Sequence, residues 1–184
     1  MPPKIRVTKE EIIKAAVDLV REQGESALNA RTVAARLNCS TQPIFFNFES
    51  MGQLRNAVIE AAYVMYRQHI RAEMESGEYP PYKASGMAYI SFAQKEKLLF
   101  QLLFMRDRTA EEIPEKTEEG DEMAAMVQDS TGLSAEEARL FHLEMWFYVH
   151  GIATMVATNF LTPDRELISR VLSDAYLGLK KNKT

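Results

Sequence analysis

Cysteine is almost absent from the 184-residue chain, which contains only Cys39. A single cysteine cannot form an internal disulfide, so disulfide-stabilised secreted domains are excluded and a reducing compartment is expected. Eight glycines and seven prolines are also few, which argues against long disordered stretches. No apolar run approaches the roughly 18 residues of a membrane span, and no signal peptide is recognisable. We therefore expect a cytoplasmic protein with no membrane partner.

Motifs of the common enzyme classes are missing as well. The sequence contains no GxSxG, HExxH, P-loop or GxGxxG pattern. Its three histidines are His69, His142 and His150. The last two lie eight residues apart on one expected helix, too far for the i, i+4 spacing of a metal-binding pair. We expect no catalytic residues, no metal site and no cofactor.

Charge is unevenly distributed along the chain. The formal net charge is −4, yet residues 1–56 carry eight Lys or Arg against six Asp or Glu, a balance of +2. The remaining residues carry fourteen against twenty, a balance of −6. Because salt screens repulsion beyond about 10 Å, the N-terminal part can contact phosphates despite the acidic remainder. The asymmetry permits nucleic-acid binding without predicting it.

Apolar spacing predicts an all-α fold of about nine helices. Thr8 opens a capping box, and Gly24 ends the first expected helix. Asn29 is a good N-cap for a short second helix, and Ser40 for a third with Pro43 in its first turn. The acidic segment 106–122 is expected to be a solvated loop or helix start. The longer helices are expected over residues 51–75, 82–104 with a bend at 95–97, 123–131, 135–160, and from 162–163 onward.

Two short helices joined by a few residues follow the first helix, which is the arrangement of a helix-turn-helix motif. The second of them, residues 41–46, would be the recognition helix that enters the major groove of DNA. Many all-helical proteins contain such a turn, so ordinary helix packing explains this arrangement equally well.

A spaced set of residues adds to this pattern. It comprises Gly24, Asn29, the segment VAARLNCS at 33–40 and the segment IFFNFESMGQL at 44–54. In these positions the sequence resembles the TetR family of bacterial transcriptional regulators. The resemblance implies a helix-turn-helix head over residues 1–50 and a helical ligand-binding and dimerisation domain over residues 51–184. It also implies a homodimeric repressor that binds palindromic double-stranded operator DNA and is released by a small, hydrophobic effector.

Three positions depart from the family pattern. Phe45 stands where Tyr is usual, Asn47 replaces the usual His or Tyr, and Met51 replaces the usual Lys. The tyrosine hydroxyl and the lysine ammonium commonly reach DNA phosphates, which dominate affinity and its salt dependence. We therefore expect DNA binding that is weaker or less sensitive to salt than in a usual member. A helical ligand-binding or interaction protein of the same fold is the alternative function.

Candidate DNA contacts lie in and around the two short helices. The amide of Gln42 can pair with adenine, and Phe46 is expected to face a thymine methyl or a sugar. Phe45 and Phe48 are expected to anchor the recognition helix by burial. The N-terminus of the second helix favours a nearby phosphate. Lys4 and Arg6 could form an N-terminal arm along the DNA. The expected DNA-binding residues are Lys4, Arg6, Arg31, Thr32, Ser40, Thr41, Gln42, Phe45, Phe46 and Asn47.

The C-terminal part is rich in Met and aromatic side chains, which suit an adaptable apolar cavity as well as an ordinary core. A hydrophobic or aromatic effector is expected, and a cationic one is compatible with Glu144 or His142 near Trp146. The expected effector-binding residues are Phe100, Leu103, Phe104, Met123, Met126, Phe141, Met145 and Trp146.

By the same resemblance, the last two helices would pack with their copies as a dimeric four-helix bundle. Trp146, His150 and Gly151 resemble the W-x3-HG pattern of one C-terminal subclass, although core or interface packing explains Trp146 and His150 as well. The expected dimerisation residues are Tyr148, Ile152, Met155, Ile168, Val171, Leu172 and Ala175.

Overall fold

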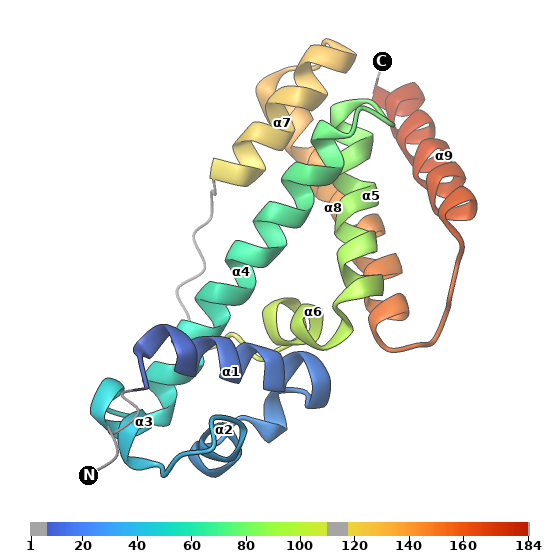
Figure 1. Ribbon diagram of the computed structural model, residues 1–184. Helices are drawn as coiled ribbons and strands as arrows, with labels where there is room; N and C mark the ends of the chain where they lie inside the picture. The colour runs from blue at the N-terminus through green and yellow to red at the C-terminus, as the bar shows by residue number, and fades with distance from the viewer. Residues whose placement is uncertain (1–6, 110–117, 184) are drawn as a thin grey trace. The chain divides into compact units, whose positions relative to one another are not determined.

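In the computed structural model, residues 7–109 and 118–183 are described, and every regular element among them is helical. This confirms the predicted all-α fold (Figure 1). None of the described helices is long and apolar enough to cross a membrane. The elements are α1 (Lys9–Gln23), the 3-10 turn η1 (Glu25–Ala27), α2 (Ala30–Arg36), α3 (Gln42–Asn47), α4 (Met51–Glu75), α5 (Pro81–Lys95), α6 (Lys97–Phe104), α7 (Glu118–Thr131), α8 (Ala135–Ala157) and α9 (Arg165–Lys183).

Side-chain caps set the starts of several helices. At α1, Thr8 Oγ1 accepts from the N–H of Glu11 at 3.1 Å, and Glu11 Oε2 accepts from the N–H of Thr8 at 2.8 Å. Asn29 caps α2, and Ser134 forms a second predicted capping box at α8. These bonds satisfy backbone donors that a helix start leaves unpaired. The sequence therefore specified these starts locally.

Other boundaries differ from the prediction. Ser40 does not cap α3, because Thr41 already has helical dihedral angles and α3 begins without a side-chain cap. The last helix begins at Arg165, where Asp164 Oδ1 accepts from the N–H of Leu167 at 2.8 Å.

The predicted bend is confirmed as a break at Glu96 between α5 and α6.

Packing divides the chain into two compact units. The first comprises Met1–Arg67 and Glu96–Arg106, and the second comprises Gln68–Lys95 and Asp107–Thr184. Helix α4 therefore contributes its N-terminal part to the first unit and its C-terminal end to the second. The predicted boundary after residue 50 was drawn between two expected functions, not between packing units. It stays a prediction.

In the first unit, α1 lies at the centre of the packing. Its residues Ile12, Ala16 and Val20 are fully buried, as expected for positions four apart on one helix face. Helix α1 packs against α2, α3 and α6. The Arg21 guanidinium adds two hydrogen bonds, of 2.5 and 2.8 Å, to Glu96. The short helices α2 and α3 are thus supported by a packed scaffold.

In the second unit, α8 is the central helix. It packs extensively against α5 and α7, and α9 packs against both α5 and α8. Phe141 and Met145 of α8 belong to a buried cluster with Val127 and Leu133. The rings of Phe141 and Tyr176 meet edge to face, with centroids 5.2 Å apart. One face of α8 is therefore used by the unit's own core.

Candidate DNA-binding surface and effector sites

The turn between α2 and α3 is closed by the backbone. The N–H of Cys39 donates to the carbonyl of Ala34 at 3.0 Å, and the N–H of Asn38 to Ala35 at 3.1 Å. Asn38 has a φ of 50°, in the left-handed region that asparagine tolerates better than most residues. The chain thus reverses quickly from α2 into α3, as a helix-turn-helix requires.

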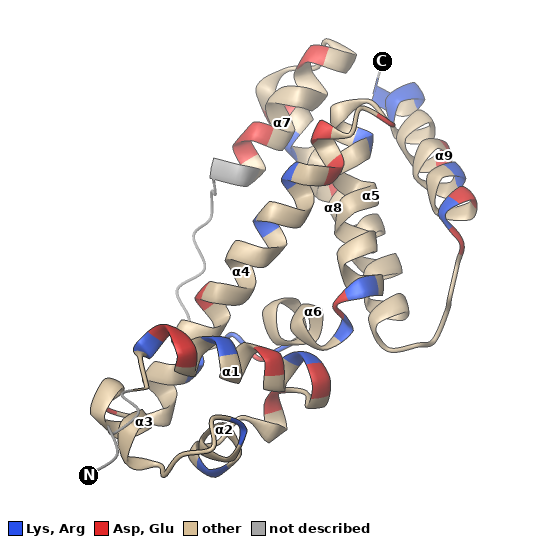
Figure 2. Cartoon of the chain, viewed as in Figure 1, with Lys and Arg blue, Asp and Glu red and all other residues tan. Residues whose placement is uncertain are grey.

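Helix α3 has a buried side and an exposed side. Ile44 and Phe48 are buried, whereas Phe45 and Phe46 are 52% and 81% exposed. The expectation that Phe45 anchors the helix is therefore wrong. Ile44 lies within α3, and Phe48 is the residue that ends it, with its N–H donating to the carbonyl of Ile44 at 2.9 Å. Helix α3 contains no charged residue, so it is tan in Figure 2.

The polar side chains expected to contact DNA around α2 and α3 differ in how exposed they are and in whether they already form hydrogen bonds. Arg31, Ser40 and Gln42 are exposed, and Thr41 is half-buried. The hydroxyl of Thr32 donates to the carbonyl of Ala27 at 2.6 Å, so its hydrogen is engaged within the motif.

Asn47 is engaged as well, because its Nδ2 donates to the carbonyl of Pro43 at 2.8 Å. Only its second N–H remains for a phosphate. Lys4 and Arg6, the expected arm, lie outside the described residues.

Most Lys and Arg side chains within residues 7–56 pair with acidic residues. An ion pair weakens the attraction of each cation for a DNA phosphate. Within residues 7–56, which the structure describes, Arg31 makes no ion pair. The pairs are Lys14–Asp18 at 2.7 Å, Arg21–Glu96 at 2.5 Å, Arg36–Glu22 at 2.6 Å and Arg55–Glu25.

The residues expected to bind the effector are divided between the two units. Those of α6 belong to the first unit, where the Phe104 ring lies 5.0 Å from Phe100 and 5.1 Å from Tyr66. The remaining five belong to the second unit. Of these, Met123, Phe141 and Met145 are buried, Met126 is half-buried and Trp146 is 39% exposed.

Two tyrosine–histidine pairs join α5 to α8. Tyr82 Oη lies 3.1 Å from His142 Nδ1, and Tyr89 Oη lies 2.9 Å from His150 Nδ1. The Trp146 ring stacks on His150 with centroids 4.8 Å apart and planes at 10°. Burial lowers the pKa of both histidines, so both are neutral at pH 7. These residues fit packing within the unit, the alternative that the sequence left open.

Two of the expected dimerisation residues face inward. Ile168 and Leu172 are buried, and the Leu172 side chain lies next to Gly86 of α5. Residues buried within one protomer cannot form a dimer contact, so these two assignments are wrong. Tyr148 is exposed, and the other four are half-buried: Ile152, Met155, Val171 and Ala175.

A broader apolar surface faces outward from α8 and α9. Sequence reasoning missed its members, although their i, i+3, i+7 spacing on α8 could have revealed them. An open cleft of about 310 Å³ adjoins it, with an apolar floor between the two helices. The exposed apolar residues are Leu140, Leu143 and Phe147 on α8 and Leu177 on α9. The cleft is lined by Glu144, Tyr148, Asp174, Ala175, Gly178 and Leu179.

Solved structures share this fold. A TetR-like transcriptional regulator from Rhodococcus sp. RHA1 matches with a TM-score of 0.70 at 15% identity, over 96% of each chain. A TetR family member from Streptomyces coelicolor A3 matches with a TM-score of 0.59 at 18% identity, over 91% of this chain and 96% of the other. The multidrug binding protein EbrR, solved with imidazole, matches with a TM-score of 0.57 at 20% identity, over 92% of each chain. At these identities the similarity establishes the fold.

Sequence comparison assigns the family. No curated protein sequence matches the chain. The family model described as "Tetracyclin repressor-like, C-terminal domain" matches residues 82–175, more than half of the chain. That match lies in the C-terminal part, whereas the sequence motifs lay in the N-terminal part. The chain therefore belongs to the TetR family of ligand-responsive transcriptional regulators.

Proposed function

We propose that this regulator is a repressor that binds palindromic operator DNA as a homodimer and is released by a small, hydrophobic effector. One observation carries the proposal, namely the outward face of α3. Phe46 is 81% exposed beside the exposed amide of Gln42, while Ile44 and Phe48 hold the helix from behind. An exposed aromatic ring beside an amide that can hydrogen-bond to a base edge suits the major groove of DNA.

On the DNA, the residues of this face take different roles. Gln42 reads an adenine through two hydrogen bonds, and Phe46 contacts a thymine methyl. Arg31, exposed and without an ion pair among the described residues, contacts a phosphate beside the start of α2. Ser40, Thr41 and the backbone of the turn add polar contacts of lower specificity.

The homodimer is supported by the outward apolar surface of α8 and α9. Single exposed apolar residues are ordinary, but a contiguous group of them marks an interaction site. In a twofold dimer the same surface serves both subunits. Leu143, Phe147, Tyr148 and Leu177 are the proposed contacts, and two heads so joined would read half-sites about 34 Å apart.

Release by an effector requires only a modest coupling free energy. A ligand that binds the DNA-free arrangement about 100-fold better shifts the equilibrium by about 2.7 kcal/mol per site. The similarity in fold to a multidrug binding protein is compatible with a hydrophobic effector. Met126 and Trp146, which are not fully buried, are the proposed contacts of the second unit.

Fluorescence anisotropy with DNA from upstream of the chain's own gene tests the proposal. We expect specific binding. Gln42→Ala should weaken it by about 10- to 100-fold for each Gln42–adenine contact that is lost. Gln68→Ala, an exposed glutamine on α4, is the matched control and should bind normally. Equal affinity for the upstream and a scrambled duplex would sink the repressor assignment.

The ion pairs of the first unit favour a second candidate, an interaction protein of the same fold with weak DNA binding. Arg21, Arg36 and Arg55 all bind carboxylates. If the chain binds no duplex specifically even at low salt, where phosphate contacts are strongest, this second candidate replaces the first.

A further inference from the structure

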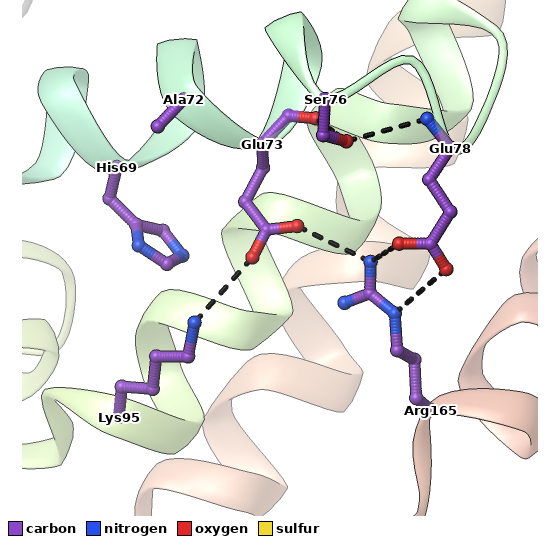
Figure 3. Close-up of a pocket in the computed structure, with 7 residues that line it drawn as sticks. All are labelled: His69, Ala72, Glu73, Ser76, Glu78, Lys95 and Arg165. Atoms are coloured by element: carbon purple, nitrogen blue, oxygen red, sulfur yellow. Dashed lines mark hydrogen bonds and ion pairs between the residues drawn. The ribbon is translucent and has the colours of Figure 1, made fainter.

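An open cleft of about 370 Å³ lies at the C-terminal end of α4 in the second unit. This volume falls in the range of small-molecule sites. The residues that line it have no part in the DNA, dimer or effector contacts proposed above. They are His69, Ala72, Glu73, Ser76, Glu78, Lys95 and Arg165 (Figure 3).

Glu73 is the most enclosed ionic group of the cleft. Its side chain is 19% exposed, against 62% for Lys95. Its contacts are long: 3.3 Å to Arg165 Nη2, 3.4 Å to Ser91 Oγ and 3.5 Å to Lys95 Nζ. Charge-assisted bonds to a carboxylate are usually about 2.7–2.9 Å. Both oxygens of Glu73 can therefore gain from a better-placed donor.

Arg165 is already matched by another carboxylate. Its Nη2 and Nε donate to Glu78 at 2.5 and 3.2 Å, and its guanidinium lies 5.4 Å from the Tyr79 ring centroid. Figure 3 shows Arg165 between Glu73 and Glu78, with Lys95 on the far side of Glu73. Glu78 would thus keep the Arg165 charge compensated if Glu73 turned to another cation.

Glu73 is charged under neutral conditions. Burial tends to raise its pKa, but the hydrogen bond from Arg165 and the positive charges of Arg165 and Lys95 outweigh burial and lower the pKa below its ordinary value. The least exposed charge facing this cleft is therefore negative, and both cations already face carboxylates. An anionic ligand would have to separate these pairs.

We propose that this cleft binds a small organic cation with a primary ammonium or amidinium group, and that Glu73 is its counter-ion. The ligand takes the place of Lys95 Nζ, which is exposed enough to turn into solvent. Its carbon part rests on Ala72 and the ring of His69, which line the same cleft. The cation then competes with Arg165 for the second oxygen of Glu73.

Binding would loosen one link between α9 and α4. Arg165 is the first residue of α9, and Glu73 lies in the last turn of α4. Residues 51–67 of α4 belong to the first unit, which carries the proposed DNA contacts. An effect on DNA affinity rests on the proposed function, but ligand binding itself does not. The site can therefore be tested without DNA.

Isothermal titration calorimetry of the full chain at constant ionic strength provides the test. Benzamidinium and n-butylammonium should bind saturably, whereas neutral benzamide and anionic butyrate should not. Glu73→Gln should weaken cation binding about tenfold or more, because it removes a charged hydrogen-bond partner. Glu75→Gln, an exposed change of equal charge on the same helix, should leave the affinity unchanged.

A second variant tests the competition in the opposite direction. Arg165→Gln removes the rival cation from Glu73 and should strengthen benzamidinium binding several-fold. Arg170→Gln changes the charge of α9 equally at an exposed position and should not.

Three results would overturn the site. They are no heat from either cation, equal affinity in the wild type and Glu73→Gln, and preferential binding of butyrate. Circular dichroism of each variant separates a lost site from lost folding, and Arg165→Gln gives a gain that unfolding cannot imitate.

Discussion

Helices α3 and α8 both carry aromatic side chains on the outside, but in different surroundings. On α3, Phe45 and Phe46 stand on a six-residue helix beside the amides of Gln42 and Asn47. On α8, Phe147 belongs to a longer apolar stripe with an apolar cleft beside it. A contiguous group of exposed apolar side chains marks a surface that binds a partner. The neighbouring polar groups indicate which partner, because base edges need hydrogen bonds and a second protein copy needs apolar area.

The largest expected effect separates the buried side of α3 from its exposed side. Phe48→Ala should lower the free energy of unfolding by about 3–5 kcal/mol, because it leaves a cavity under the helix. Phe46→Ala should change it by less than about 0.5 kcal/mol. Urea denaturation at one protein concentration measures both. A similar loss in both variants would show that Phe46 is a core residue rather than a DNA contact.

Next in size is the effect of a charge on the α8 surface. Phe147→Asp should weaken the proposed dimer about 100-fold, because an aromatic contact near the centre of an interface carries much of its free energy. Sedimentation equilibrium measures the dissociation constant. Phe46→Asp is the matched control on α3 and should leave the dimer intact. The reverse pattern would exchange the roles of the two surfaces.

Salt dependence gives a smaller effect that concerns the first unit alone. Since four of the six cations within residues 7–56 are ion-paired, the slope of log K against log salt should be shallower than about −6. Arg31→Ala should reduce its magnitude by about 1 for each bound head. Arg36→Ala should not, because Arg36 already pairs with Glu22. Anisotropy titrations between low and moderate salt provide the slopes, and a wild-type slope of −6 or steeper contradicts this expectation.

The smallest effect concerns pH and the second unit. Burial lowers the folded-state pKa of His142 below the ordinary 6.5, so the unfolded chain takes up this proton more readily. Stability from this group is complete above about pH 6.5 and falls as pH drops toward the folded pKa. His142→Gln should flatten this part of the curve of unfolding free energy against pH. An unchanged curve would mean that other groups set the acid sensitivity.

The helix starts and the family motif could be predicted from sequence because they depend on near neighbours. Thr8, Asn29 and Ser134 cap their helices through residues two or three positions away, so the amino-acid order suffices to recognise them. The family assigned from the N-terminal motif was confirmed by an independent match in the C-terminal part.

The expectations that failed depend on which side of a helix faces its neighbours. Phe45 and Ile44 are adjacent and both apolar, and only the packing of α3 shows that Ile44 is the anchor. The spacing of Ile168 and Leu172 suggests interface residues, but both are buried within the protomer, and Leu172 lies next to Gly86 of α5. The ion pair between Arg21 and Glu96 joins residues 75 positions apart, which no local pattern reveals.

By itself, the sequence determined the helical fold, the capped helix starts and the family, because these follow from periodic spacing and local hydrogen bonds. The tertiary structure decided which side chains remain available to a partner. Among the described residues Arg31 makes no ion pair, whereas Arg36 pairs with Glu22, and Glu73 differs from Glu75 in lining a cleft. Both distinctions arise from contacts between different helices, whose positions are fixed only when the hydrophobic faces pack together.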